Sequence, residues 1–239
     1  MLTYPKIDTV YERNADHRVP KYKLERHLRR AEFSLPARWL VTEKIDGTNI
    51  RIPFSTRLDV SPNSGYVGAR GRTDAAQIPP FLLTFLQETF TLPKLVSCFD
   101  PDTTGILFGE GYGARIQKGG GNYRSDVSFR LFDVLIFSQE DQSVARDPAD
   151  DGRAWWLNWR DVEDVARKLS IETVPVVARM ATLAQAIQVV EEGLGSVVAQ
   201  EENDRMDINA EGVVARTDPL LFDRHGQRVM WKLKERDFA

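Results

Sequence analysis

Short apolar runs divided by turn residues constrain the fold of this chain most. Residues 39–44 and 49–54 are rich in β-branched and aromatic side chains, and Asp46-Gly47 lies between them. This pattern predicts two strands joined by a tight turn. Similar runs predict further strands at residues 66–70, 105–110, 128–137, 212–216 and 228–233.

Helical spacing of apolar residues is confined to a few segments. We expect helices at residues 22–32, 81–90, 161–169 and 183–192. Strands and helices do not alternate regularly, which disfavours a doubly wound parallel sheet. The length of 239 residues fits one large domain. The sequence therefore predicts a single α+β domain over the whole chain, with antiparallel sheets flanked by helices.

The overall charge excludes nucleic-acid binding through a net positive charge of the whole chain. Lys and Arg total 32 and Asp and Glu total 35, which gives a formal net charge of −3. Any contact with phosphates must therefore come from a local basic patch. The N-terminus has no signal-peptide pattern, and no window approaches the roughly 20 apolar residues of a membrane span. We expect a soluble, cytoplasmic protein.

Cysteine and histidine predict no metal site. Cys98 is the one cysteine, which excludes an internal disulfide and a cysteine zinc site. His17, His27 and His225 show no ligand spacing.

Lys44 stands out because a lysine ends an apolar, strand-like run. The stretch VTEKIDGTNIRI places it directly before Ile45, Asp46 and Gly47. Two interpretations of K-x-D-G are open: a salt-bridged turn, in which Lys44 pairs with Asp46, or a lysine nucleophile. The short match by itself does not decide between them.

Four more sequence islands follow along the chain. They are Phe108-Gly109-Glu110-Gly111, Phe129-Arg130-Leu131-Phe132-Asp133-Val134, Glu211-Gly212-Val213-Val214 and Trp231-Lys232-Leu233-Lys234. Strand alternation in the last island puts Lys232 and Lys234 on one face, and Trp231 with Leu233 on the other. Taken singly, each island is explained by a strand end, an aromatic core strand or a solvated lysine face.

Taken together, the five islands resemble the motif series of the covalent nucleotidyltransferases. These are the ATP-dependent DNA ligases, the RNA ligases and the mRNA capping enzymes. The resemblance implies an adenylyltransferase domain in which Lys44 attacks the α-phosphate of ATP. A lysine amine must first lose its proton, because its unperturbed pKa is about 10.4. Lys232 and Lys234, if they face Lys44, and a bound divalent cation would promote that loss and stabilise the phosphate charge.

The residues after K-x-D-G narrow the resemblance. DNA ligases and capping enzymes usually carry arginine two residues after the glycine, whereas this chain has Asn49 in KIDGTN. KIDGTN is similar to the RNA ligases of the second phage type, the branch that includes the kinetoplastid RNA-editing ligases. The similarity continues through YPKIDTVYER, GRTDAAQIP, GEGYGARIQKGG and WKLKERDF, and so covers essentially the whole chain.

This resemblance implies an ATP-dependent RNA ligase acting in RNA repair. Such an enzyme forms a covalent lysyl-AMP intermediate, passes AMP to an RNA 5′-phosphate and seals that end to a 3′-hydroxyl. The implied catalytic residues are Lys44, Asp46, Glu211, Lys232 and Lys234. The residues implied at the nucleotide are Glu43, Lys44, Ile45, Asn49, Arg72, Glu110, Phe132, Glu211, Lys232 and Lys234.

Several of these residues carry a specific expected role. Glu110 would bind the ribose, and Phe132 would stack on adenine with Phe129 as the alternative. Glu211, through water, and Glu110 would hold Mg²⁺ or Mn²⁺. Arg72 matches the arginine that touches the nucleotide and the 5′-phosphate, and Arg70 is its rival.

The resemblance leaves the RNA-binding surface open. The chain stops five residues after Lys234, so we expect neither the C-terminal OB-fold of DNA ligases and capping enzymes nor the helical domain of phage-type RNA ligases. An intrinsic surface or a partner protein must then supply RNA affinity. The candidates are the basic run at residues 21–30, Arg70, and Arg115, Lys118 and Arg124 in the glycine-rich loop. The loop is favoured over the basic run because glycines let backbone N–H groups reach phosphates.

Two other classes of function remain open. One is a minimal ATP-dependent DNA ligase or capping-type nucleotidyltransferase. The other is a nucleotide-binding accessory subunit that does not catalyse.

Overall fold

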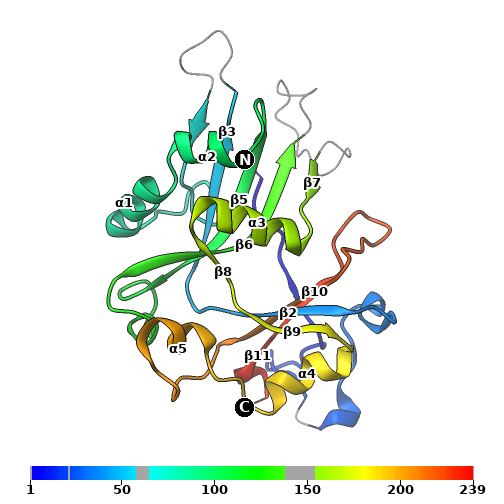
Figure 1. The fold of residues 1–239 in the computed structure, drawn as a ribbon. Helices are drawn as coiled ribbons and strands as arrows, with labels where there is room; N and C mark the ends of the chain where they lie inside the picture. The colour runs from blue at the N-terminus through cyan, green and yellow to red at the C-terminus, as the bar shows by residue number, and fades with distance from the viewer. Residues whose placement is uncertain (1, 21, 58–64, 138–153, 239) are drawn as a thin grey trace. The chain divides into compact units, whose positions relative to one another are not determined.

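The computed structural model describes most of the chain in two compact units (Figure 1). The described residues are 2–20, 22–57, 65–137 and 154–238. Unit 1 comprises Met1–Tyr4 and Gly47–Thr173, and unit 2 comprises Pro5–Asp46 and Val174–Ala239. The boundary after Asp46 falls inside the K-x-D-G island. Compactness does not test whether the units fold separately, so the single domain stays a prediction.

Unit 1 is built on a six-stranded sheet in the order β4-β3-β5-β6-β7, with β8 paired to β6. The strands are β3 (Thr48–Ser55), β4 (Tyr66–Val67), β5 (Thr104–Gly113), β6 (Val127–Phe137), β7 (Ala154–Trp156) and β8 (Glu172–Thr173). The long strands β3, β5 and β6 pair antiparallel and lie side by side in Figure 1. The predicted antiparallel sheet is therefore confirmed.

The helices of unit 1 are α1 (Pro80–Thr89), α2 (Leu92–Cys98) and α3 (Trp159–Leu169), with the 3₁₀ turn η3 (Gly120–Asn122) in the glycine-rich loop. α3 buries Trp159, Val162, Ala166 and Leu169. Their spacing of three to four residues forms one apolar stripe, which is the signature of a helix packed on a core. α3 contacts α2, β6 and β8.

Unit 2 is built on a five-stranded sheet in the order β1-β11-β10-β2-β9. The strands are β1 (Asp8–Thr9), β2 (Trp39–Glu43), β9 (Val176–Ala181), β10 (Gly212–Thr217) and β11 (Met230–Lys234). The helices are α4 (Leu183–Glu191) and α5 (Val197–Asn203), with 3₁₀ turns η1 (Lys23–Glu25), η2 (Ala31–Ser34) and η4 (Glu235–Asp237). β1 pairs parallel to β11, and the other strand pairs are antiparallel.

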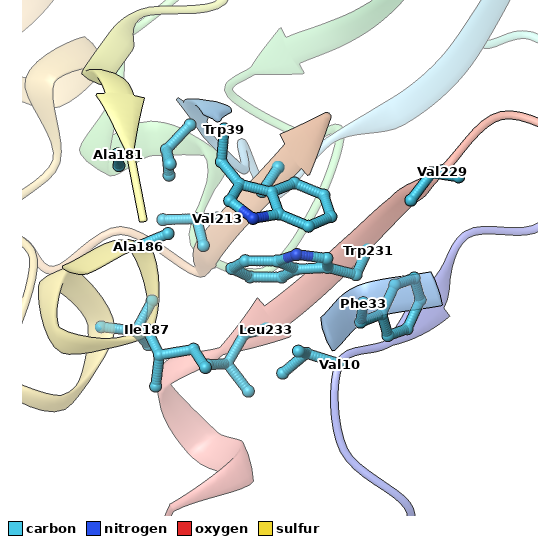
Figure 2. Close-up of a cluster of buried hydrophobic side chains, with 13 residues drawn as sticks. Val10, Phe33, Trp39, Ala181, Ala186, Ile187, Val213, Val229, Trp231 and Leu233 are labelled. Carbon is cyan, nitrogen blue, oxygen red and sulfur yellow. The ribbon is translucent and has the colours of Figure 1, made fainter. Parts of the chain in front are cut away.

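Two tryptophans lie at the centre of the unit 2 core. Figure 2 shows Trp39 of β2 beside Trp231 of β11, with ring centroids 5.6 Å apart. Leu233 and Val213 belong to the same buried cluster. Trp231 and Leu233 are fully buried whereas Lys232 between them is half-buried. The predicted alternation of β11 is confirmed, and it leaves the lysines on the face away from the core.

The predicted hairpin across Asp46-Gly47 is wrong. β2 and β3 belong to different sheets. β2 pairs with β10 on one side and β9 on the other, and β3 pairs with β4 and β5. Both edges of each strand are already used, so the turn connects two sheets instead of two paired strands.

The predicted helix over residues 22–32 is also wrong. This segment holds η1 and the start of η2. Leu24 is 96% exposed, so a helix here would gain little burial. Instead, Arg26 Nε donates to the Pro20 carbonyl oxygen at 2.9 Å, and Leu28 forms a bridge with Tyr11. Residue 21 of the basic run lies outside the described residues.

The remaining predicted elements are present, with shifts of a few residues at their ends. The additional helices and strands that the sequence patterns did not predict are α2, α5, β1, β7, β8 and β9. Across the described parts of the chain, no helix combines the length and the apolar character that a membrane span requires.

Candidate active site

Three strand ends of unit 2 meet around Glu211. Lys44 follows the last residue of β2, Glu211 precedes β10, and Lys234 ends β11. The Lys44 backbone N–H donates to the Gly212 carbonyl oxygen at 2.9 Å, and Gly212 is the register partner of Lys234. The sheet therefore brings the first, fourth and fifth islands together.

The Glu211 carboxylate lies between two ammonium groups. Lys44 Nζ donates to Oε2, and Lys234 Nζ donates to Oε1. The three side chains are 14–23% exposed, so the cluster is partly shielded from water. Lys44 is salt-bridged, but its partner lies 167 residues away. A long-range cluster of this kind differs from the local turn that the first interpretation of K-x-D-G required.

Opposing effects act on the ionisation of Glu211. Burial acts to raise the pKa of this carboxyl, but the positive charge of Lys44 and the hydrogen bonds from both lysines outweigh it. The pKa of Glu211 is therefore held below its ordinary value. The carboxylate stays ionised, and it neutralises part of the positive charge gathered around Lys44.

Gly212 allows this arrangement because no other residue fits there. Its φ is +151°, and a Cβ at this position would lie 2.1 Å from the Leu233 carbonyl oxygen and 2.6 Å from Lys234 Cα. β10 and β11 approach each other so closely that glycine is required beside Glu211.

The residues that flank Lys44 are buried. Ile45 is 2% exposed and Glu43 is 1% exposed. Glu43 Oε1 accepts a hydrogen bond from Ser196 Oγ at 2.6 Å, and Oε2 accepts one from the Val198 backbone N–H at 3.1 Å. The assignment of Glu43 to the nucleotide stays a prediction, and in the structure its carboxylate holds the start of α5.

In unit 1, Asn49 and Glu110 are direct neighbours across β3 and β5. Residues paired in this way share one face of a sheet. Glu110 is half-buried. Asn49 Oδ1 is buried and accepts no hydrogen bond within the described residues. A buried acceptor left unsatisfied is unusual in a folded protein, and it is suited to a donor from a ligand.

A β-bulge sets the position of Phe132. Phe108 pairs with Asp133 whereas the next residue, Gly109, pairs with Leu131, so Phe132 is the extra residue of β6. The Phe132 ring packs against Tyr4, with centroids 5.0 Å apart, and Tyr4 Oη donates to Asp133 Oδ2 at 2.7 Å.

The alternative stacking residue is part of the core. Phe129 is 3% exposed and packs against Phe90 at 5.1 Å between ring centroids. A Cβ on Gly109 would lie 2.0 Å from this ring. Phe129 therefore fills space inside unit 1, and Phe132 is the more accessible aromatic face.

The rival arginines of the GRT segment are both exposed. Arg70 Nη1 donates to the Ala69 carbonyl oxygen at 3.0 Å, and Arg70 lines a cavity of about 720 Å³. Gly71 and Asp74 line the same cavity from the loop, and Leu86 lines it from α1. Arg72 forms no ion pair with another described residue, so its guanidinium is available to an anion.

The glycine-rich loop presents its three cations differently. Arg124 is paired with Asp126, its Nη2 lying 3.0 Å from Oδ2. The Arg115 guanidinium lies 4.5 Å from the centre of the Phe81 ring. Lys118 is exposed. Pairing with Asp126 reduces the attraction of Arg124 for phosphate, and Arg115 and Lys118 remain the stronger candidates of the loop.

The family model that matches this chain is that of RNA ligase, and it covers residues 37–234. The match spans most of the sequence and includes all five islands. The chain belongs to the RNA ligase family. No curated protein sequence matches the chain.

Solved structures share the fold of this family member. A Naegleria gruberi RNA ligase mutant with AMP and Mn matches with a TM-score of 0.60 and 13% identity, covering 99% of this chain and 57% of that one. A second mutant of that ligase with AMP and Mn matches with a TM-score of 0.55 and 15% identity, over 85% and 51% of the two chains. An archaeal ATP-dependent RNA ligase matches with a TM-score of 0.50 and 16% identity, over 99% and 49%. The chain thus spans about half the length of these structures.

The carboxylates of this RNA ligase family member can supply only part of the ligands of a divalent cation. Among the described residues, no three or more His, Cys, Asp or Glu side chains gather into a metal cage. Mg²⁺ usually needs one or two carboxylates together with substrate phosphates. Glu211 in unit 2 and Glu110 in unit 1 are hard oxygen donors of this kind, and each fits a cation that arrives with a nucleotide.

Sequence patterns missed two residues that shape these clusters. Ser196 precedes α5 and accepts a hydrogen bond from the Ala199 backbone N–H. A serine directly before an apolar segment is an N-cap signal, so this residue could have been found. Tyr4 contacts Phe132 across a long sequence separation, and no local pattern predicts that contact.

Proposed function

We propose that this protein is an ATP-dependent RNA ligase that forms a covalent lysyl-AMP intermediate on Lys44. The observation that carries the proposal is the cluster of Lys44, Glu211 and Lys234 in unit 2. It joins three islands that are distant in sequence, in a chain of the RNA ligase family. The structures that it resembles include ligases with ATP or AMP and Mn.

The first step is attack by the Lys44 amine on the α-phosphorus of ATP. A bond forms between Nζ and phosphorus, the bond from phosphorus to the bridging oxygen breaks, and pyrophosphate leaves. Lys44 must first leave the Glu211 carboxylate and release its proton to water. Lys234 lies on the other side of Glu211, where its ammonium group can stabilise negative charge on the phosphate.

The later steps pass AMP to RNA and then release it. The 5′-phosphate of one RNA end attacks the lysyl-AMP phosphorus, which frees Lys44 and activates that end. The 3′-hydroxyl of the other end then attacks the activated phosphate, and AMP leaves as the phosphodiester forms. Lys232 is assigned to the phosphates, and Asp46 to the nucleotide site and to end joining.

Residues of unit 1 are assigned to the nucleotide by the motif order of the family. Phe132 would stack on adenine and Glu110 would accept from the ribose hydroxyls. Asn49 Oδ1 is buried and accepts no hydrogen bond from the described residues, which supports its assignment to a hydroxyl-bearing ligand. Arg72 would contact the 5′-phosphate. Glu211 and Glu110 are each assigned to a divalent cation, which would neutralise charge on the phosphates.

The assignment to a branch of the family rests on the motif KIDGTN. We place the chain in the branch of the second phage type, with RNA ends as substrates in a repair reaction. Arg70, Arg115 and Lys118 are the candidate contacts to RNA, and an accessory protein could add affinity. A cytoplasmic location stays an expectation.

The proposal is tested by label transfer from ATP labelled at the α-phosphate. Wild-type protein with Mg²⁺ should give a labelled band on a denaturing gel, and Lys44→Ala should give none. Tight ATP binding with no covalent band in wild type would favour the non-catalytic accessory subunit. The labelled protein is then chased with nicked RNA and nicked DNA. Sealing of DNA in preference to RNA would favour a DNA ligase, and a label obtained with GTP and not ATP would favour a capping-type enzyme.

A further inference from the structure

Glu43 is a buried acidic residue directly before the proposed nucleophile. It is 1% exposed, and a carboxylate in such surroundings is unfavourable unless its oxygens find donors. Both do, since Oε1 accepts from Ser196 Oγ at 2.6 Å and Oε2 accepts from the Val198 N–H at 3.1 Å. The end of β2 is thereby tied to the start of α5.

Ser196 takes part in both ends of this connection. Its hydroxyl donates to Glu43 and also accepts from the Ala199 N–H at 3.0 Å, which makes it the N-cap of α5. The residue is 3% exposed, so water competes little for these bonds. One hydroxyl therefore links the helix to the strand from which Lys44 extends.

The backbone around Ser196 also holds the segment that leads to Glu211. Ser196 N–H donates to the Ile208 carbonyl oxygen at 2.7 Å, and Ala210 N–H donates to the Leu194 carbonyl oxygen at 2.8 Å. Glu211 is the next residue along the chain. Glu43 and Ser196 thus connect the two strand ends that present Lys44 and its carboxylate partner.

We propose that Glu43 and Ser196 are positioning residues that hold Lys44 and Glu211 in register for nucleotide transfer. The inference rests on the proposed function and assigns Glu43 a role beside Lys44 in place of a direct contact with nucleotide. Loss of the link should affect the rate of transfer from bound ATP more than the binding of ATP, because small displacements of a nucleophile have large effects on rate.

Ser196→Ala tests the link, with Thr182→Ala as the matched control. Thr182 is the N-cap of α4 in the same unit and accepts from the Gln185 N–H at 3.3 Å, so its loss removes a comparable cap away from Lys44. The rate of adenylate formation at saturating ATP should fall about tenfold in Ser196→Ala, with half-saturation by ATP unchanged within about twofold. Thr182→Ala should leave both quantities near wild type, and Ser196→Thr, which keeps a hydroxyl, should recover most of the rate.

Amide hydrogen exchange provides a readout that does not depend on activity. The Lys44 N–H is bonded to Gly212, so its exchange reports the register of the two strand ends. We expect faster exchange in peptides containing Lys44 in Ser196→Ala than in Thr182→Ala. If Ser196→Ala and Thr182→Ala showed equal rates of adenylate formation and equal exchange at Lys44, the inference would be overturned. The proposed function would still stand if wild-type protein took up the label. If wild-type protein took up no label, the proposed function would be rejected. The exchange comparison would still test the link between Glu43 and Ser196.

Discussion

At the scale of single residues, Glu211 determines the resting state of the candidate site. One carboxylate accepts hydrogen bonds from Lys44 and Lys234, so the proposed nucleophile is paired with Glu211 until a ligand arrives. Nucleotide phosphates carry the same sign of charge as Glu211 and can take over one of the two lysines. Glu211 therefore holds the amine of Lys44 in a defined position.

Glu211→Gln should make folding less sensitive to acid. The pKa of Glu211 is lowered in the folded protein, so its carboxylate contributes stability above the ordinary value of about 4.3, and this contribution is lost as pH falls through the folded-state pKa. The free energy of unfolding should fall more steeply in wild type than in the variant from about pH 5 to pH 3, and the variant should be less stable at pH 7 by roughly 1–3 kcal/mol. Urea denaturation at a series of pH values measures both.

The matched control for this change is Glu192→Gln, since Glu192 is an exposed glutamate of the same unit. It should follow the wild-type curve. Parallel pH dependences for wild type and Glu211→Gln would contradict the assignment.

At the scale of elements, the close approach of β10 and β11 brings the fourth and fifth islands together. Gly212 lies opposite Lys234, and the two strands leave no room for a Cβ there. The registry of this strand pair is also set by Trp231 and Leu233, which are locked in the core (Figure 2). The lysines of β11 are therefore fixed by packing on the opposite face of the strand.

Gly212→Ala should separate the ends of β10 and β11. The added methyl group would lie 2.1 Å from the Leu233 carbonyl oxygen at a φ that side chains rarely adopt. We expect a loss of about 2 kcal/mol in stability and a loss of most adenylate formation. Gly195→Ala is the control, because a Cβ there meets nothing within 4 Å. Equal denaturation midpoints for the two variants would show that the strands tolerate the methyl group.

At the scale of the whole molecule, the chain passes between the two units three times, after Tyr4, Asp46 and Thr173. Neither unit 1 nor unit 2 is a continuous piece of sequence. The second crossing lies two residues after Lys44, and the third directly follows β8. Continuity of the backbone at this point couples the nucleophile to the start of β3.

The whole chain should unfold in one cooperative transition, as the prediction of a single domain requires. Each unit consists of two separate segments of the chain, so unfolding of one unit would release the segment ends that it holds for the other unit. Pulsed hydrogen exchange across a denaturant series should give the same midpoint for peptides from β5 and β6 as for peptides from β10 and β11. Separate midpoints would establish two independently stable domains.

Local patterns predicted most of the long elements of this fold. β5, β6, β10 and β11 lie close to their predicted ranges, and the alternation of Trp231, Lys232 and Leu233 was correct. These features depend on period-two alternation and turn residues, which a short stretch of sequence contains. The hairpin at Asp46-Gly47 and the helix at 22–32 failed because partner strands and burial, not local propensity, decided those segments.

The sequence by itself determined the order of the five islands, and through it the family and the residues to examine. Only the tertiary structure decided which of them meet. It paired Lys44 with Glu211, 167 residues away, placed Phe132 in a bulge, and buried Glu43 against Ser196. The physical reason is that side-chain alternation is local to a strand, whereas the partner of a charge depends on which distant strand ends the sheet brings together.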